Sequence, residues 1–354
     1  MAGGTGGHVF PGLAVAAYLK QAGWRVVWLG TEGGMEKRLV PGQGHDLEII
    51  RFSGLRGKAF TTWLTLPLRL LLALWQSAGV ILSVRPDVVL GMGGYPAFPG
   101  GMMASLLRKP LLIHEQNSIP GLVNKILARL ADKVLLGFPD AIRGGRKVIF
   151  SGNPVRHEIS EVEAPEKRYG KRRGQLKLLV IGGSLGAQAL NTFVPQALRL
   201  IPEKMRPVVT HQTGLRHVDV VRKSYAEAGV EGNLVPFIEN MAAQYADCDL
   251  VVCRAGALTI AELTSVGVAS VLVPFPYAVD DHQTSNAKFL SDRNAAVLLQ
   301  QHELTPQRLA ELLTAFSREQ LLEMAIRARR LAKPDSTRVV AEACMEMMTN
   351  RSGS

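Results

Sequence analysis

Residues 176–191 read LKLLVIGGSLGAQALN: an apolar run, a glycine-rich turn and the start of a helical pattern. A turn of this kind between a strand and a helix presents backbone N–H groups at the positive end of the helix dipole. That arrangement binds anions such as phosphate. The stretch is typical of the first strand, turn and helix of a nucleotide-binding α/β domain.

A second glycine-rich turn, GGTGGH at residues 3–8, lies 179 residues earlier and also precedes a helical pattern. Two such turns, half a chain apart, predict two similar halves. The earlier turn differs in one respect, because only Met1 and Ala2 stand before it. We therefore expect its supporting strand to be missing, and we interpret the start of the chain as truncated or misassigned.

Apolar, β-rich runs alternate with helical stretches along the chain. The runs lie at 25–29, 47–52, 87–90, 111–114, 133–136 and 148–150, and then at 176–181, 208–211, 234–237, 250–253 and 270–273. This alternation predicts an α/β fold. With the paired glycine turns it indicates two Rossmann-like, doubly wound parallel-sheet domains facing across a cleft.

Domain boundaries follow from a charged segment at 160–175, SEVEAPEKRYGKRRGQ, which we interpret as a linker or surface loop. The domains are then expected at 1–157 and 158–334. A final helix is expected after Pro334, at about 335–349, with Asp335 or Ser336 as its cap.

Charge is distributed unevenly between the two halves. The 354 residues carry a net charge of +11, with 47% hydrophobic and 20% charged residues, a composition that excludes a disordered chain. Residues 1–157 hold 18 Lys and Arg against 8 Asp and Glu, a net +10, and residues 158–354 a net +1. A basic half attracts nucleic acid, a membrane or an acidic substrate. Only 6% of the residues are aromatic and no stacking motif accompanies the basic residues, so nucleic acid is not expected.

The cysteines and the apolar segments indicate where in the cell the protein is expected. Cys248, Cys253 and Cys344 match neither a disulfide framework nor a zinc pattern, so we expect a reducing compartment. Met1 runs directly into the glycine turn, with no leader pattern. The longest uncharged apolar stretch, 70–84, has 15 residues. A spanning helix needs about 20, so we expect a protein that touches a membrane without crossing it.

Neither glycine turn fits the two commonest nucleotide motifs. Read as G-x-G-x-x-G from Gly4, the first turn has Val9 in place of the third glycine. The Gly-Lys-Ser/Thr ending of a P-loop is missing from both turns. The sequence therefore disfavours a dehydrogenase or a nucleoside triphosphatase.

Further motifs follow one another along the chain. They are GGTGGHVFPGLAVA at 3–16, SGLRGK at 53–58, GMGGYPAFPGG at 91–101, HEQNSIPG at 114–121, SGNPVR at 151–156, GGSLGAQALN at 182–191, FIENMAAQYADCDLVVCRAGALTIAEL at 237–263 and DDHQTSNA at 280–287. In combination they resemble the MurG family, the peripheral membrane glycosyltransferases of peptidoglycan synthesis, over essentially the whole chain. The resemblance implies the GT-B architecture, with the nucleotide sugar held mainly by the C-terminal domain and residues 335–354 packed back on the N-terminal one.

The resemblance also implies a reaction. GlcNAc would move from UDP-GlcNAc to the MurNAc 4-hydroxyl of lipid I (undecaprenyl-pyrophosphoryl-MurNAc-pentapeptide), with inversion, to form lipid II. The expected location is the cytoplasmic face of the bacterial inner membrane, with cell-wall synthesis machinery as a further partner. The alternative is another UDP-sugar enzyme of the same fold, such as a UDP-GlcNAc 2-epimerase or a diacylglycerol glycosyltransferase, which would lack the HEQN and GGYP loops.

Substrate-binding residues are carried over from the family's motifs. They are Thr5, Gly6, Gly7, Asn117, Arg156, Ser184, Ile238, Ala257, Leu258, Thr259, Ile260, Ala261, Glu262 and Gln283. The guanidinium of Arg156 suits the leaving pyrophosphate, and the amide of Gln283 suits the sugar hydroxyls. By resemblance Ser184 contacts phosphate, the backbone of Ile238 contacts uracil, and Glu262 holds the ribose. For Glu262, a capping or solvated glutamate is the alternative.

Catalysis needs a base for the attacking hydroxyl. His8 is the first candidate because imidazole titrates near neutral pH; the alternative is a histidine that orients the acceptor or caps the helix. Glu115 is the second candidate. No paired-carboxylate DxD motif is visible, so we expect neither a metal nor another cofactor. The neighbouring Asp280, Asp281 and His282 seldom converge on one ion.

Residues 63–84 form the most apolar segment and show two stripes at helical spacing. One stripe holds Leu70, Leu71, Leu74, Ala78 and Ile81, and the other Leu68, Leu72, Trp75, Gly79 and Leu82. A surface helix normally has one apolar face, so we expect one stripe to pack on the core and the other to contact an anionic membrane leaflet. Arg69, Arg56 and Lys58 would then reach the headgroups. A fully buried core helix is the alternative.

Overall fold

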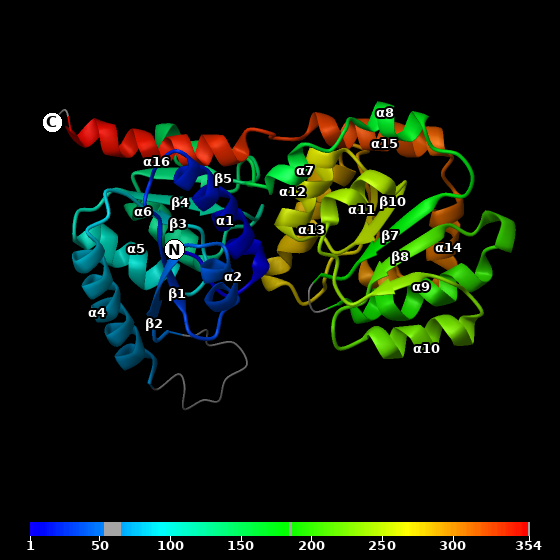
Figure 1. Cartoon of the computed structure of the whole chain (residues 1–354), viewed down its shortest axis with the longest axis horizontal. Coiled ribbons are helices and arrows are strands. Elements are labelled where there is room, and N and C mark those ends of the chain that lie inside the picture. The colour runs from blue at the N-terminus through cyan, green and yellow to red at the C-terminus, as the bar shows by residue number, and fades with distance from the viewer. Residues whose placement is uncertain (53–64, 184–185, 353–354) are drawn as a thin grey trace. The chain divides into compact units, whose positions relative to one another are not determined.

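The computed structural model describes residues 1–52, 65–183 and 186–352. The chain divides into two compact units (Figure 1): unit 1 comprises Met1–Arg156 and Pro334–Ser354, and unit 2 comprises His157–Lys333. Every strand pairing is parallel, and helices alternate with strands in both units, so the predicted α/β class is confirmed. Arg56, Lys58 and Ser184 lie outside the described residues.

Unit 2 is built on one six-stranded sheet in the order β9-β8-β7-β10-β11-β12. The strands are β7 (Lys177–Ile181), β8 (Val208–Gln212), β9 (Asn233–Val235), β10 (Leu250–Cys253), β11 (Ala269–Leu272) and β12 (Val297–Leu298). Counted from β7, this is the strand order 3-2-1-4-5-6 of a Rossmann domain. The first strand is therefore central, and it leads through the second glycine turn into α9 (Gln188–Leu200).

Helices cover this sheet. Besides α9 they are α7 (His157–Ser160), α8 (Pro165–Gly170), α10 (Val218–Ala228), α11 (Met241–Asp247), α12 (Ala257–Val266), α13 (His282–Ser291), α14 (Pro306–Thr314) and α15 (Arg318–Arg330). Side-chain caps begin several of them: Asn240 accepts a hydrogen bond from Ala243 N–H, and Thr305 one from Arg308 N–H. The apolar faces of α9, α10, α14 and α15 meet the sheet in one core.

Unit 1 has its strands in two groups. β1 (Val27–Thr31) pairs with β2 (Asp46–Ile50), while β3 (Val89–Gly91), β4 (Leu111–Glu115), β5 (Lys133–Leu136) and β6 (Val148–Phe150) form a second sheet. Met1 lies beside β3: its amino group donates to Leu90 O at 2.8 Å, and Met92 N–H donates to Met1 O at 2.8 Å. These two bonds are those of a parallel strand residue opposite Gly91.

The helices of unit 1 are α1 (Gly6–Gln21), α2 (Glu36–Gly42), α4 (Leu66–Val84), α5 (Ala97–Leu106), α6 (Leu122–Leu130) and α16 (Ser336–Ser352). The last of these packs on α1, where Val340 and Cys344 join Val15 and Leu19 in one core (Figure 1). Ser336 Oγ anchors its start by donating to Asn153 O at 2.8 Å. The C-terminal segment thus belongs structurally to unit 1.

The charged segment 160–175 is not simply a linker, and that prediction is wrong for its middle. Residues 165–170 form α8, in which Arg168 and Tyr169 are buried. The Arg168 guanidinium donates to Tyr245 O at 3.2 Å and to Val266 O at 2.9 Å, carbonyls at the ends of α11 and α12. A run of basic residues predicts exposure, but carbonyls at helix C-termini can accept from a buried guanidinium.

Candidate functional site

The first glycine turn is held by a buried carboxylate that the sequence analysis did not single out. Glu36, the first residue of α2, accepts from Gly4 N–H at 3.0 Å. Its other oxygen accepts from the N–H and the hydroxyl of Thr31, at 2.9 and 2.8 Å. A Cβ at Gly34 would lie 1.9 Å from Glu36 Oε2, so glycine is required there. Glu36 therefore ties residues 3–8 to the end of β1.

His8 takes part in a chain of hydrogen bonds inside unit 1. Its Nδ1 lies 2.9 Å from Gln116 Oε1, and Gln116 Nε2 donates to Met92 O at 2.8 Å. Gln116 Nε2 also lies 3.1 Å from His114 Nδ1, and His114 Nε2 lies 2.9 Å from Gly152 O. Burial lowers the pKa of His114 to about 4, so this imidazole is neutral.

These contacts assign the tautomers by elimination. Gly152 O can only accept, so neutral His114 carries its proton on Nε2 and accepts through Nδ1 from the Gln116 amide. Gln116 Oε1 must then accept from a proton on His8 Nδ1. The lone pair of His8 is left on Nε2, as a general base requires.

Glu115 has a different environment. It is 2% exposed, and its Oε1 accepts from Asn117 N–H at 2.9 Å. Its Oε2 accepts from Asn124 Nδ2 at 2.9 Å and from Gly121 N–H at 3.1 Å. A carboxylate engaged on both oxygens anchors its loop, so the geometry favours His8 over Glu115 as the base. The loop so anchored presents Asn117.

Two loops of unit 1, which follow β4 and β6, meet beside the start of α1. Asn153 Nδ2 donates to Gln116 O at 3.0 Å, which joins the loop at 151–156 to the loop at 114–121. The Arg156 guanidinium lies 5.9 Å from the centre of the Phe10 ring on α1. The structure therefore places Thr5, Gly6, Gly7 and His8, at the start of α1, near the loops that carry Asn117 and Arg156.

In unit 2 the helix expected to face the donor begins directly after β10. Gly256 is the N-cap of α12, and the first turn comprises residues 257–260. The N–H groups of a first helical turn have no acceptor inside their own helix, so they are suited to bind phosphate. This holds for Ala257, Leu258 and Thr259, with Ile260 and Ala261 following in the same helix.

Glu262 lies further along α12 and is 7% exposed. The Tyr245 hydroxyl on α11 donates to Glu262 Oε2 at 3.1 Å. Burial raises the pKa of Tyr245 well above its usual value, so the hydroxyl keeps its proton and remains a donor. This contact fixes the Glu262 carboxylate, and Tyr245 is a residue that the sequence analysis missed. Ile238, expected to contact uracil, is buried just before α11.

Gln283 lies on α13, at the end of the loop that follows β11. Its Oε1 accepts from Phe275 N–H at 2.9 Å, so the side-chain carbonyl already has a protein partner. Arg254 holds the same loop by donating to Val273 O and Pro274 O, at 3.1 and 3.0 Å. Gln283 is therefore oriented to donate through its amide nitrogen.

Within residues 1–52, 65–183 and 186–352, no group of three or more His, Cys, Asp and Glu side chains is arranged to hold a metal ion. Asp281 and His282 have local partners. Thr284 Oγ1 donates to Asp281 Oδ1 at 2.7 Å, and His282 Nδ1 lies 2.8 Å from Val279 O.

Comparison with known proteins matches both halves to one family. Residues 1–136 match the glycosyltransferase family 28 N-terminal domain, and residues 177–339 match the C-terminal domain of the same family. The chain is 71% identical, over 98% of both chains, to the UDP-N-acetylglucosamine–N-acetylmuramyl-(pentapeptide) pyrophosphoryl-undecaprenol N-acetylglucosamine transferase of Nitrosospira multiformis. The crystal structure of Acinetobacter baumannii MurG matches with a TM-score of 0.85 and 40% identity, over 98% of both chains. The chain belongs to the MurG family.

MurG-family membership makes the chain a glycosyltransferase of GT-B fold, as the motifs predict. A UDP-N-acetylglucosamine 2-epimerase structure also matches, with a TM-score of 0.65 over 95% of this chain and 91% of that one, but at 13% identity. Likeness at that level is a likeness of fold alone. The match to the epimerase therefore shows a shared architecture and nothing about the activity of this chain.

Proposed function

We propose that the chain transfers GlcNAc from UDP-GlcNAc to the 4-hydroxyl of the MurNAc sugar in lipid I and so forms lipid II. The observation that carries the proposal is the 71% identity, over nearly the full length, to a curated transferase named for this reaction. The chain also contains the HEQN and GGYP loops, which by resemblance distinguish the lipid I transferases from the alternative enzymes.

The reaction proceeds by one displacement, which accounts for the inversion. The acceptor oxygen attacks the anomeric carbon of GlcNAc and gives its proton to His8 Nε2, while the bond from that carbon to the diphosphate breaks and UDP leaves. Arg156 and the first N–H groups of α12 would carry the charge that develops on the diphosphate. Ser184, in the second glycine turn, is a further proposed phosphate contact.

Donor recognition is assigned to groups already fixed by their neighbours. Glu262 would accept from the ribose hydroxyls, because Tyr245 holds its carboxylate in place. Gln283 would donate its amide N–H to a GlcNAc hydroxyl, because its carbonyl is engaged by Phe275. Asn117, Thr5, Gly6 and Gly7 complete the proposed sugar contacts from unit 1, and the backbone of Ile238 the uracil contact.

The direct test is to incubate labelled UDP-GlcNAc with the protein and either lipid I, diacylglycerol or no acceptor. We expect label in lipid II only, because the HEQN and GGYP loops are those of the lipid I transferases. UDP-ManNAc formed without an acceptor, or ManNAc and UDP if water then cleaves it, would identify an epimerase. Labelled diacylglycerol would identify the other alternative. Either result without transfer to lipid I would overturn the proposal.

Membrane binding is proposed for the outer face of α4, which Figure 1 shows at the edge of unit 1. Ala73, Ser77 and Ile81 face the protein, where α4 packs on α5 and β2. Leu68 is 71% exposed and Trp75 75% exposed, and Leu71, Leu72 and Leu82 are exposed as well. The alternative of a fully buried helix is therefore wrong, and so is the expectation that Leu71 packs on the core.

By length and composition, Leu66–Val84 is the one helix among the described residues that could cross a membrane. A helix with one side packed on an α/β body has only its other side available for lipid, which favours a surface position. With Arg69 exposed at its first turn and a basic N-terminal half, α4 would lie on the anionic cytoplasmic leaflet of the inner membrane. Contacts with cell-wall synthesis machinery would follow from that location.

Replacing both Leu72 and Trp75 by serine is expected to lower binding to phosphatidylglycerol vesicles by at least about tenfold, because each apolar side chain lost from lipid costs roughly 1.5–3 kcal/mol. Flotation measures the bound fraction. Leu215→Ser in unit 2 is the matched control, since Leu215 is 72% exposed but lies on the other unit. Unchanged flotation of the double variant would show that α4 is not the membrane contact.

A further inference from the structure

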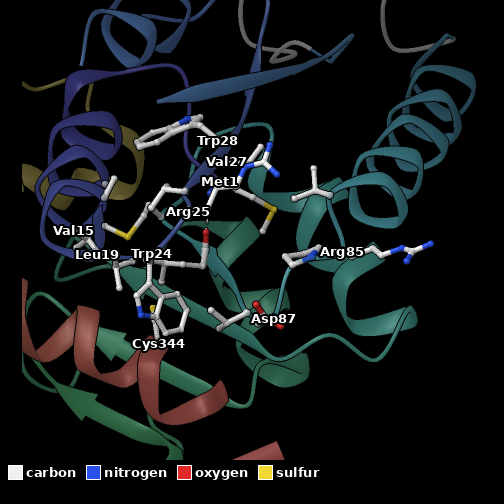
Figure 2. A pocket seen from close by; sticks show the side chains of 18 residues that line it. Met1, Val15, Leu19, Trp24, Arg25, Val27, Trp28, Arg85, Asp87 and Cys344 are labelled. Atoms are coloured by element: carbon white, nitrogen blue, oxygen red, sulfur yellow. Dashed lines mark hydrogen bonds between the residues drawn. The ribbon is translucent and has the colours of Figure 1, made fainter. Parts of the chain in front are cut away.

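Unit 1 contains a cavity of about 240 Å³, and Figure 2 shows Val15, Leu19 and Trp24 among the side chains that line it. The residues labelled there are mostly apolar. Recognition of one particular ligand also needs a few polar groups that are held in place. Unit 2 has such groups around Arg254, which follows directly after β10.

The guanidinium of Arg254 holds several oxygens at once. Its Nη1 donates to Val273 O at 3.1 Å and to Pro274 O at 3.0 Å, and its Nη2 donates to Gln301 Oε1 at 2.6 Å. The guanidinium also lies 5.4 Å from the centre of the Phe275 ring. These acceptors are uncharged, so the contacts depend on the planar, forked arrangement of N–H groups that arginine has and lysine lacks.

The peptide unit that joins Pro274 to Phe275 has Arg254 on one side and Gln283 on the other. Its oxygen accepts from Arg254 Nη1, and its N–H donates to Gln283 Oε1 at 2.9 Å. This peptide is trans, and in a trans peptide the C=O and N–H bonds point in opposite directions. Rotation of the peptide unit would therefore break both hydrogen bonds together.

The local sequence, VPFPY at 273–277, restricts the backbone on both sides of this peptide unit. The ring of Pro274 fixes its own φ, and Pro276 confines Phe275 to extended conformations. Neither restriction sets ψ of Pro274, the angle that turns the peptide unit. Its orientation is therefore left to its two hydrogen bonds, and Arg254 makes the one on the oxygen side.

The orientation of this peptide unit determines which group Gln283 offers to a ligand. Because an N–H can only donate, Gln283 Oε1 faces Phe275 and Nε2 faces away from it. Among the residues that the structure describes, none accepts a hydrogen bond from Gln283 Nε2. If the peptide turned over, its oxygen would face Gln283, and the amide would have to turn and present Oε1 instead.

We propose that Arg254 is a positioning residue for the donor sugar: through the Pro274–Phe275 peptide it makes Gln283 donate, rather than accept, the hydrogen bond to a sugar hydroxyl. The inference rests on the proposed function, in which Gln283 contacts GlcNAc. Gln301 supports the same arrangement, because it holds the other side of the guanidinium.

Calorimetric titration of the full chain with UDP-GlcNAc and with UDP tests the proposal, because the ratio Kd(UDP-GlcNAc)/Kd(UDP) isolates the contribution of the sugar. Arg254→Lys keeps the positive charge and loses the planar fork. We expect this variant to bind UDP as the parent chain does. It should bind UDP-GlcNAc about three- to tenfold more weakly, the usual contribution of one hydrogen bond, so the ratio rises by that factor.

Arg293→Lys is the matched control. Arg293 also lies over a phenylalanine ring, 4.9 Å from the centre of Phe289, and it donates to Phe289 O at 2.9 Å. Neither contact involves the loop that precedes α13, so the ratio should stay at the parent value. An equal rise in both variants would show that the effect does not come from the Pro274–Phe275 peptide, and would overturn the proposal.

The double variant tests whether Arg254 acts through Gln283. Gln283→Ala should raise the ratio by itself, and Arg254→Lys should then add little to it, because the two residues act on one contact. An unchanged ratio in Gln283→Ala would overturn the proposed GlcNAc contact and this inference with it. A raised ratio in Gln283→Ala, combined with a parent-like ratio in Arg254→Lys or with full additivity in the double variant, would overturn this inference alone.

Gln301→Leu guards against a poorly folding Arg254→Lys. It removes the acceptor of Arg254 Nη2 and leaves the loop before α13 unchanged in sequence. We expect a smaller rise of the same ratio, with UDP bound as in the parent chain. If Arg254→Lys binds neither ligand, a parent-like ratio in Gln301→Leu would overturn the proposal in its place.

Discussion

Replacement of His8 by alanine lowers kcat for GlcNAc transfer to lipid I by about 10²- to 10⁴-fold, the usual contribution of a general base. The KM for UDP-GlcNAc should stay close to that of the parent chain, because the proposed donor contacts of His8's loop are made by Thr5, Gly6 and Gly7. Steady-state transfer of labelled GlcNAc measures both constants. A parent-like kcat in His8→Ala would exclude His8 as the base.

Gln116 provides the companion variant, since it is the hydrogen-bond partner of His8 Nδ1. Gln116→Leu removes the acceptor for His8 Nδ1–H, so we expect a smaller loss of kcat, with His8 distributed between both tautomers. Nitrogen chemical shifts of labelled histidine report the tautomer independently of activity. A parent-like tautomer in Gln116→Leu would contradict the assignment.

Replacement of Asp249 by alanine lowers the free energy of unfolding of unit 2 by about 3 kcal/mol, because it leaves two partly buried cations without their shared counter-charge. The Asp249 side chain is 1% exposed and lies 2.9 Å from Arg172 Nη1 and 3.3 Å from Arg318 Nε. It also accepts from Lys177 N–H at 2.8 Å, at the start of β7. Urea unfolding followed by circular dichroism measures the loss.

Asp247→Ala is the matched control, two residues away. Asp247 pairs with Lys177 Nζ at 2.6 Å, but the two side chains are 65% and 47% exposed. A solvent-exposed pair contributes about 0–1 kcal/mol, so this variant should unfold close to the parent. Equal losses in the two variants would show that burial of the Asp249 cluster is not what stabilises unit 2.

The alternation of apolar runs with helical stretches and the two glycine-rich turns predict the fold. They do so because strands, helices and turns are determined largely by residues that are neighbours in the chain. The strand before the second glycine turn is an example: a continuous apolar run is predicted at 176–181, and β7 occupies Lys177–Ile181 at the centre of its sheet. The gathering of loops at strand ends also follows, since parallel strands bring their carboxyl ends to one edge.

The roles of the acidic residues could not be predicted in this way. In the sequence, nothing marks Glu115 and Glu36 as structural residues. In the structure both carboxylates are buried, and each holds a loop by accepting hydrogen bonds from backbone N–H groups. His8 is distinguished as the base only by Gln116, which lies 108 residues away in the chain. Such partners leave no local signal, because the contact depends on which loops the folded sheet places together.

The faces of helices show the same difference between what local sequence predicts and what tertiary packing determines. Periodicity predicts a helix over the apolar segment and two apolar stripes, and α4 has both an inner and an outer apolar face. Which side chains lie on each face was decided by packing on α5, and Leu71 is exposed although its stripe was expected on the core. Likewise α8 buries Arg168 in a segment whose charge predicts exposure.

The local sequence pattern was thus sufficient to predict the α/β class and the two similar halves, and to identify the motifs of a MurG-family glycosyltransferase. The spacing of apolar residues and the residue types of turns act over a few positions, so they can be read directly from the sequence. Burial, hydrogen-bond partners and the tautomer of His8 were settled only by the tertiary structure. Each of these depends on the free energy of removing a polar group from water, and that free energy is set by residues distant in the chain.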